Sequence, residues 1–294
     1  MKCIVFYIGL SLQSGRVLPL IEEDCQIYVR QMIDLKRTSA RDCTKLFWQT
    51  VLILLGASNI SNRLQGVVVP EGFDKSLTDM PPAVATFRGQ QAFLNVMFGN
   101  HRAGADLCIS NDGFHMQVAP MNPLIQGELF MGGLSCFAMA REGKASKYVK
   151  QAKRTWKVFK EWNDKGNPYA KHSFALLDAE LSALNKDQKG AVKRYQSAIS
   201  FATRGGFRHD AALASERLGE LALEMGDKEE AVYRFKEAVR YYNEWGAKRK
   251  VDSLQDKHSH LWPAITEIFM VPGDESERLE GSSFNAGGSF NSLY

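Results

Sequence analysis

The chain has 294 residues, of which 45% are hydrophobic and 24% are charged, a composition that excludes a largely disordered chain. Its 37 basic and 33 acidic residues leave a net charge of +4, which is too small to indicate nucleic acid or anionic lipid as a partner. Five cysteines without a CxxC pair indicate reduced thiols and a cytoplasmic location, not a disulfide framework.

The first element is an apolar run from Cys3 to Leu12, which follows Lys2. It has two interpretations, a secretory signal or a helix of the protein core. No small-residue cleavage site follows the run, and it is too short to span a bilayer, so the core helix is favoured. Apolar residues at helical spacing then predict helices over residues 22–36 and 39–55.

Two irregular connections interrupt the helical pattern. Residues 57–82 are expected to be either a disordered insertion or a loop with a short helix at 61–69. Helices are predicted again over 83–98 and 101–109, and residues 110–123 form the second irregular stretch.

The rest of the chain up to about residue 265 has the pattern of helix pairs joined by short turns. The predicted pairs are 124–140 with 145–162, 172–184 with 190–203, and 210–225 with 228–245. Beyond them, residues 266–294 are rich in Gly, Ser, Asn and Glu and are expected to form a disordered C-terminal tail.

A triplet of small, aromatic and small residues marks the second helix of the last two pairs. Its members are Ala191, Tyr195 and Ala198, which recur 40 positions later as Ala231, Phe235 and Ala238. Offsets of four and seven lie along one stripe of a helix, and small residues allow a neighbouring helix to approach closely. Two copies predict stacked units of one design, so residues 1–265 are expected to form an all-α solenoid of antiparallel helical hairpins.

These motifs resemble tetratricopeptide repeats, in which a Leu-Gly pair lies in the first helix and a glycine in the turn. Leu218, Gly219 and Gly226 occupy those positions here. The proline that usually ends such repeats is replaced by Asn243, so the helices are tetratricopeptide-like and not regular repeats.

A narrower resemblance begins where the last pair ends, at Tyr242-Asn243-Glu244-Trp245-Gly246-Ala247-Lys248-Arg249-Lys250-Val251. This segment is similar to the end of the α-solenoid module of large multidomain signalling proteins, and residues 14–28 and 48–56 resemble earlier parts of that module. In that family an ATPase domain, often after a serine/threonine kinase-like domain, precedes the solenoid, and histidine-kinase domains can follow. Further helices also precede the region, so residues 3–12 would be the remnant of one. Trp245 and Gly246 have two interpretations, a packed helix end or a docking epitope for another domain, and the first is favoured.

Catalysis by this chain is not expected. The sequence contains no G-x-x-x-x-G-K-[ST] loop, no glycine-rich kinase loop, and no HRD or DFG element, so the ATPase and kinase activities of the family do not carry over. His258 and His260 lack further metal ligands nearby, and His209-Asp210 is interpreted as a helix start. Cys108 and Cys136, near His101 and His115, lack a third catalytic group. We therefore expect no catalytic residue, cofactor, metal or small-molecule substrate.

The inner face of the solenoid is expected to bind protein. In tetratricopeptide domains that clamp a C-terminal carboxylate, Lys and Asn lie at positions that here hold Leu176, Glu180, Glu216 and Glu220. The three glutamates would repel a carboxylate, so they predict a groove for a basic peptide, the alternative being an ordinary solvated face.

Together these patterns predict a non-catalytic interaction or regulatory scaffold of intracellular signalling. Its partner would be a protein, for example a signalling kinase or ATPase, with no nucleic acid or membrane involved. The alternatives are a fragment of a multidomain kinase or nucleotide cyclase whose catalytic domains are missing, and a decayed fragment without function.

Overall fold

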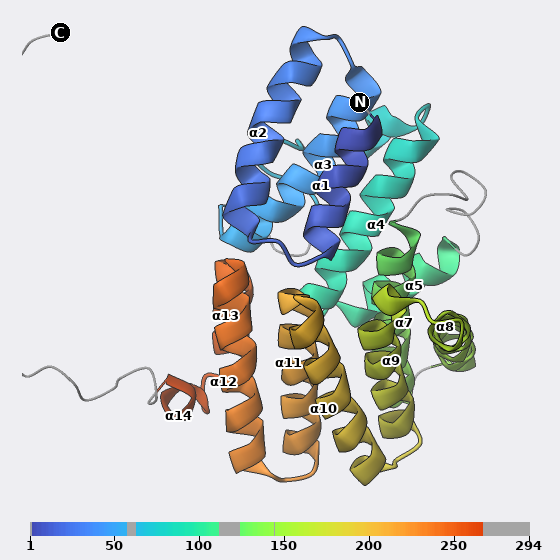
Figure 1. Cartoon of the computed structure of the whole chain (residues 1–294), viewed down its shortest axis with the longest axis vertical. Helices are drawn as coiled ribbons and strands as arrows, with labels where there is room; N and C mark the ends of the chain where they lie inside the picture. The colour runs from blue at the N-terminus through green and yellow to red at the C-terminus, as the bar shows by residue number, and fades with distance from the viewer. Residues whose placement is uncertain (1, 58–62, 112–123, 144, 267–294) are drawn as a thin grey trace, which may run out of the picture.

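A computed structural model describes residues 2–57, 63–111, 124–143 and 145–266 (Figure 1). In these ranges every regular element is a helix, which confirms the all-α class. The first half contains α1 Lys2–Gln13, α2 Leu18–Asp34, α3 Thr38–Leu55, the short 3-10 helix η1 Phe73–Leu77, α4 Pro81–Met97 and α5 His101–Ser110. The second half contains α7 Ile125–Arg141, α8 Ser146–Asp164, η2 Pro168–Ala170, α9 Lys171–Leu184, α10 Gln188–Gly205, α11 Arg208–Glu224, α12 Lys228–Trp245, α13 Lys248–Lys257 and α14 Trp262–Thr266.

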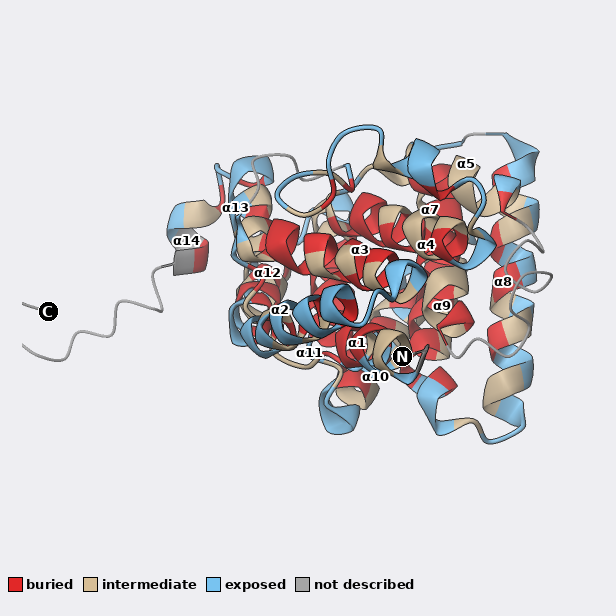
Figure 2. Ribbon diagram, turned by 90° about the horizontal axis from the view of Figure 1, so that it is seen from above, coloured by how far each residue is buried: buried red, intermediate tan, exposed pale blue. Residues whose placement is uncertain are grey.

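Neighbouring helices pack in pairs, as an α-solenoid requires. The most extensive contacts join α11 with α12 and α9 with α10, and α10 also contacts α11, so the last two pairs lie against each other. In the first half α2 packs on α3, and α5 of the first half packs on α7 of the second. The buried surfaces of these helices face inward, whereas α2 and α8 present exposed residues outward (Figure 2).

The repeated triplet lies at the contact between paired helices, as predicted. All six of its side chains are at most 1% exposed. On the facing helix, a Cβ added at Gly219 would lie 2.8 Å from the ring of Phe235. Glycine at this position therefore allows α11 and α12 to approach as closely as they do, and the aromatic ring fills the space.

Short turns with capping residues join the paired helices. The side chains of Asp187 and Asp227 accept hydrogen bonds from the backbone N–H groups of Gly190 and Glu230, each at 3.0 Å. An aspartate that satisfies a free N–H group in the first turn stabilises the start of a helix. These caps explain why the boundaries of α10 and α12 could be predicted closely.

Besides the contacts of α4 and α5 with α7, Trp245 at the end of α12 links the two halves of the chain. Its side chain is fully buried, and its indole N–H donates a hydrogen bond of 3.1 Å to the backbone oxygen of Arg16, 229 positions earlier. Its ring also lies beside Phe93 and His209, with centroid distances of 6.5 and 5.1 Å. The packed interpretation of Trp245 is confirmed, and Gly246 follows it in a left-handed conformation with φ of 94°.

The connection at 57–82 differs from the prediction over its described part. Residues 63–69 form bends and not a helix, and η1 at 73–77 is the one regular element in the described part of this connection. The stretch is also packed, because Leu64, Val69 and Leu77 are buried in a small second core against α3 and α4. The side chain of Gln49 accepts hydrogen bonds from two backbone N–H groups of this loop, at 3.0 and 3.3 Å. Most of the second irregular stretch, 112–123, and the tail from 267 onward lie outside the described residues.

Candidate functional site

Two hollows and one charged helix face are the candidates for function. The first hollow, here called the charged groove, lies where the ends of α5, α7, α9 and α11 meet the end of α13, and has a volume of about 570 Å³. Glu216 and Glu220 line it, so the structure brings two of the three predicted glutamates to one groove. The groove is balanced in charge, since four basic residues (Arg141, Lys186, Arg217, Lys257) face four glutamates (Glu142, Glu216, Glu220, Glu224).

Glu180 lies beneath this groove and not on its surface. Its side chain is completely buried, and its Oε1 accepts a hydrogen bond of 2.8 Å from Arg217, while Arg141 lies 3.5 Å from its Oε2. Burial alone would raise the pKa of this carboxyl, but the two arginine charges outweigh it and lower the pKa. The expectation that Glu180 faces a ligand is therefore corrected, because a partner in the groove cannot reach it.

Glu216 and Glu220 are also paired within the chain. Glu216 accepts hydrogen bonds from the Tyr242 hydroxyl at 2.8 Å and from the buried Lys250 ammonium at 2.7 Å. Glu220 accepts from Lys257 at 2.6 Å and from His258 at 2.9 Å. A basic peptide would have to displace these partners, so recognition by the acidic groove stays a prediction.

The helix α8 carries a face of unpaired cations. Its buried stripe consists of Tyr148, Ala152, Thr155 and Phe159. On the opposite side Lys150, Lys153 and Lys157 are exposed at spacings of three and four, and none forms an ion pair with another described residue. We call these three lysines the basic face of α8.

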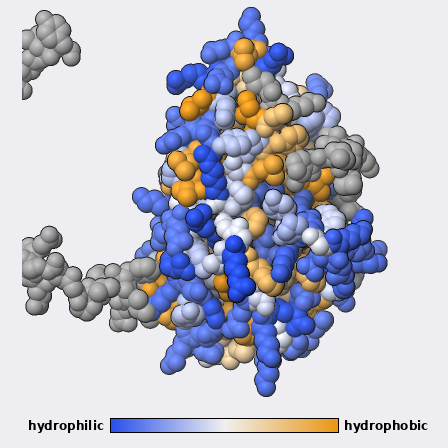
Figure 3. Space-filling view, in the orientation of Figure 1, coloured by the Kyte–Doolittle hydropathy of each residue, from blue (hydrophilic) through white to orange (hydrophobic). Residues whose placement is uncertain are grey.

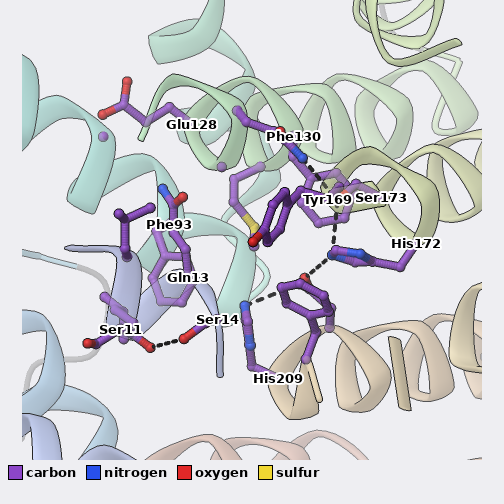
Figure 4. Close-up of a pocket in the computed structure, with 18 of the residues that line it drawn as sticks. Ser11, Gln13, Ser14, Phe93, Glu128, Phe130, Tyr169, His172, Ser173 and His209 are labelled. Carbon is purple, nitrogen blue, oxygen red and sulfur yellow. Dashed lines mark hydrogen bonds and ion pairs between the residues drawn. The ribbon is translucent and has the colours of Figure 1, made fainter. Parts of the chain in front are cut away.

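The second hollow, here called the junction cavity, lies where α1 and α4 of the first half meet α7, α9 and α11 of the second (Figure 4). Its volume is about 690 Å³, which is within the range of small-molecule sites. One end of it holds a polar cluster of four buried side chains, His172, Ser173, His209 and Asp210. The sequence predicts a helix start at His209-Asp210, and the pair does lie in the first turn of α11. Both residues also line this cavity.

The polar cluster is not a Ser-His-Asp catalytic triad. In such a triad the serine and the carboxylate contact opposite ring nitrogens of the histidine. Here Asp210 Oδ2 and Ser173 Oγ both approach the same nitrogen of His172, Nε2, at 2.9 and 3.2 Å. His172 therefore cannot accept a proton from Ser173 at one ring nitrogen while Asp210 holds the other ring nitrogen, as a triad requires.

Two buried cysteines, Cys43 and Cys136, are not activated thiols. The pKa of Cys136 is raised by its hydrogen bond with Cys108 and by burial, and burial also raises the pKa of Cys43 to about 11. A thiol with a raised pKa is a weak nucleophile at neutral pH. In the part of the chain that the structure covers, no three His, Cys, Asp or Glu side chains gather as metal ligands would.

The comparisons with known proteins add no relative: no family model, no curated protein and no solved structure matches the chain. The tetratricopeptide and signalling resemblances therefore rest on the sequence motifs alone. Among the described helices, none has the length and apolar character needed to cross a membrane.

The cavity residues were missed by sequence reasoning. His172 and Asp210 are 38 positions apart on different helices, and each has an ordinary helical neighbourhood in the sequence. The only available signal was the adjacent pair of titratable residues at 209–210, and it predicts a helix start equally well.

Proposed function

We propose that this protein is a non-catalytic helical scaffold that binds an acidic segment of a partner protein through the basic face of α8. The observation that carries the proposal is the row of three exposed lysines without an ion-pair partner among the described residues. The signalling setting, in the cytoplasm and with a kinase or ATPase as partner, is supported by the sequence resemblance.

The energetics favour this face over the charged groove. Six of the eight charged residues that line the groove already have ion-pair partners, so an incoming peptide would mostly exchange one ion pair for another. The three lysines of the basic face have no ion pair with another described residue to lose when they contact carboxylates. Like charges along a rigid helix also accelerate the approach of an acidic partner. Residues 150–157 span about 10 Å, which matches a few residues of an extended peptide.

A neutral or apolar partner surface is less well matched. On the face of the molecule seen in Figure 3, hydrophobic residues form small separate groups among hydrophilic ones. Stable apolar docking sites instead need a contiguous patch of several hundred Å².

Nucleic acid is disfavoured as the partner of the same lysines. Proteins that bind single strands combine basic residues with exposed aromatic rings on which bases stack. The aromatic residues of α8 are buried or half-buried: Tyr148, Trp156, Phe159 and Trp162. Trp156 also donates its indole N–H to Asp178 at 2.9 Å, which fixes the ring against α9.

The test is a charge reversal of the face with a matched control. The variant Lys150→Glu/Lys153→Glu/Lys157→Glu is compared with Lys189→Glu/Lys193→Glu/Lys228→Glu, which changes three exposed lysines of α10 and α12 by the same charge. The probe is a fluorescent peptide rich in glutamate, titrated by anisotropy at low and at high salt.

We expect the α8 variant to weaken peptide binding by at least tenfold, which corresponds to the loss of about three surface ion pairs. The control variant should weaken binding by less than threefold. High salt should weaken binding to the natural protein. Equal losses in both variants, or tighter binding of a single-stranded oligonucleotide of the same charge, would overturn the proposal.

A further inference from the structure

The junction cavity is a partly open hollow with mostly apolar walls. Side chains from α1, α4, α7, α9 and α11 surround it, and several of those labelled in Figure 4 point toward its open centre. Its apolar walls include Leu10, Leu12, Phe93, Phe130, Met131 and Phe207. Tyr169, which is 66% exposed, lies at its edge, so the cavity is accessible from solvent.

Two acidic residues stand in the described part of the wall. The charged residues that line the cavity are Glu128 and Asp210, and neither lysine nor arginine lines it. Burial would raise the pKa of Asp210, but His209 and the hydrogen bond with His172 outweigh it, and the pKa is lowered. The pKa of His209 is also lowered, mainly by burial, although the charge of Asp210 opposes this shift.

Several buried polar atoms in the wall have no hydrogen-bond partner among the described residues. They include the side-chain oxygen of Gln90, the Oδ1 oxygen of Asp210 and the Nδ1 atom of His209, on residues that are at most 8% exposed. The two oxygens can only accept hydrogen bonds. Buried acceptors without donors cost free energy, and a bound molecule with N–H groups would satisfy them.

We infer that the junction cavity binds a small organic cation, a protonated amine attached to a flat apolar ring. The ammonium group would donate to Asp210 and to the oxygen of Gln90, and the ring would pack against the aromatic walls. Ammonium groups interact favourably with carboxylates and with the faces of aromatic rings, and both are present here. A carboxylate ligand would instead be repelled by the negative charge of Asp210.

Such a ligand would also connect the two halves of the chain. Gln90 belongs to α4 and Asp210 to α11, and one residue of each helix, Phe93 and His209, lies beside the ring of Trp245. A ligand that contacts both helices stabilises their contact, because it binds the folded arrangement and not the separated helices. The scaffold would then respond to a small molecule.

The test uses the full chain and three probes of nearly the same shape. They are 2-naphthylmethylamine, which is a cation, 2-naphthoate, which is an anion, and 2-naphthylmethanol, which is neutral. Binding is measured by calorimetry and by the shift of the thermal unfolding temperature. We expect the amine to bind at least tenfold more tightly than the other two.

Two variants locate the site. Asp210→Asn removes the charge, and Leu10→Trp narrows the cavity at a wall residue that is 41% exposed and does not touch the polar cluster. Each should weaken amine binding at least tenfold, whereas Asp256→Asn, at an exposed carboxylate on α13, should leave it unchanged. If Asp210→Asn fails to fold, Leu10→Trp decides the question. Equal affinity for the three probes, no binding of the amine, or amine binding that neither cavity variant weakens would overturn the inference.

Discussion

Replacing Glu180 by glutamine tests whether the buried ion pairs beneath the charged groove stabilise the fold. The side chain of Glu180 is fully buried, and Arg217, its closest partner at 2.8 Å, is 10% exposed in its side chain. Glutamine keeps the shape but removes the charge, so the guanidinium of Arg217 would lie buried without its counter-ion. Breaking a buried pair in this way costs about 3–5 kcal/mol.

The control is Glu224→Gln, on α11. Glu224 contacts Arg141 at 2.5 Å, but its side chain is 60% exposed, and exposed pairs contribute about 1 kcal/mol or less. Both variants are measured by urea unfolding followed by helical circular dichroism. The reasoning would be refuted if Glu180→Gln lowered the free energy of unfolding by less than about 1 kcal/mol, or by no more than the control does.

A double replacement separates the net contribution of the pair from the cost of breaking it. Glu180→Leu with Arg217→Met removes both charges and retains apolar volume. Replacing a whole buried pair by apolar residues is often close to neutral, so the double variant should recover most of the stability that Glu180→Gln loses. If the double variant is as unstable as the single one, packing and not charge determines the effect.

Three further predictions concern the helix contacts and pH. Gly219→Ala should cost about 1–3 kcal/mol in urea unfolding, because its Cβ would lie 2.8 Å from the Phe235 ring; an unchanged midpoint would contradict the close packing. Trp245→Phe should also lower the free energy of unfolding by about 1–3 kcal/mol, because the backbone oxygen of Arg16 loses its hydrogen-bond donor. An unchanged stability would mean that the contact between the two halves does not depend on this bond. Burial chiefly, with nearby cations, lowers the pKa of His101 to about 3, so the folded protein binds this proton more weakly than the unfolded chain. Stability should therefore fall as the pH drops below about 6.5, by about 2 kcal/mol at pH 5 from this residue, and His101→Gln should remove that part of the slope.

The sequence by itself determined the helices and their pairing. The start and end of a helix depend on apolar spacing and turn residues that lie within a few positions of each other in the sequence. The predicted bounds of α12, 228–245, therefore equal the observed ones, and the predicted start of α3 differs by one residue. The repeated triplet also predicted which side of each second helix is buried, because that side is fixed by the helical period.

Only the tertiary structure decided what each buried side meets. The period of a helix places Glu180 on an inner face, but whether solvent or an arginine occupies that face depends on how distant helices pack. The same holds for the junction cavity, whose polar cluster joins residues 38 positions apart, and for Trp245, whose partner lies 229 positions away. Such contacts follow from the shapes of whole packed surfaces, and no local pattern of residues encodes them.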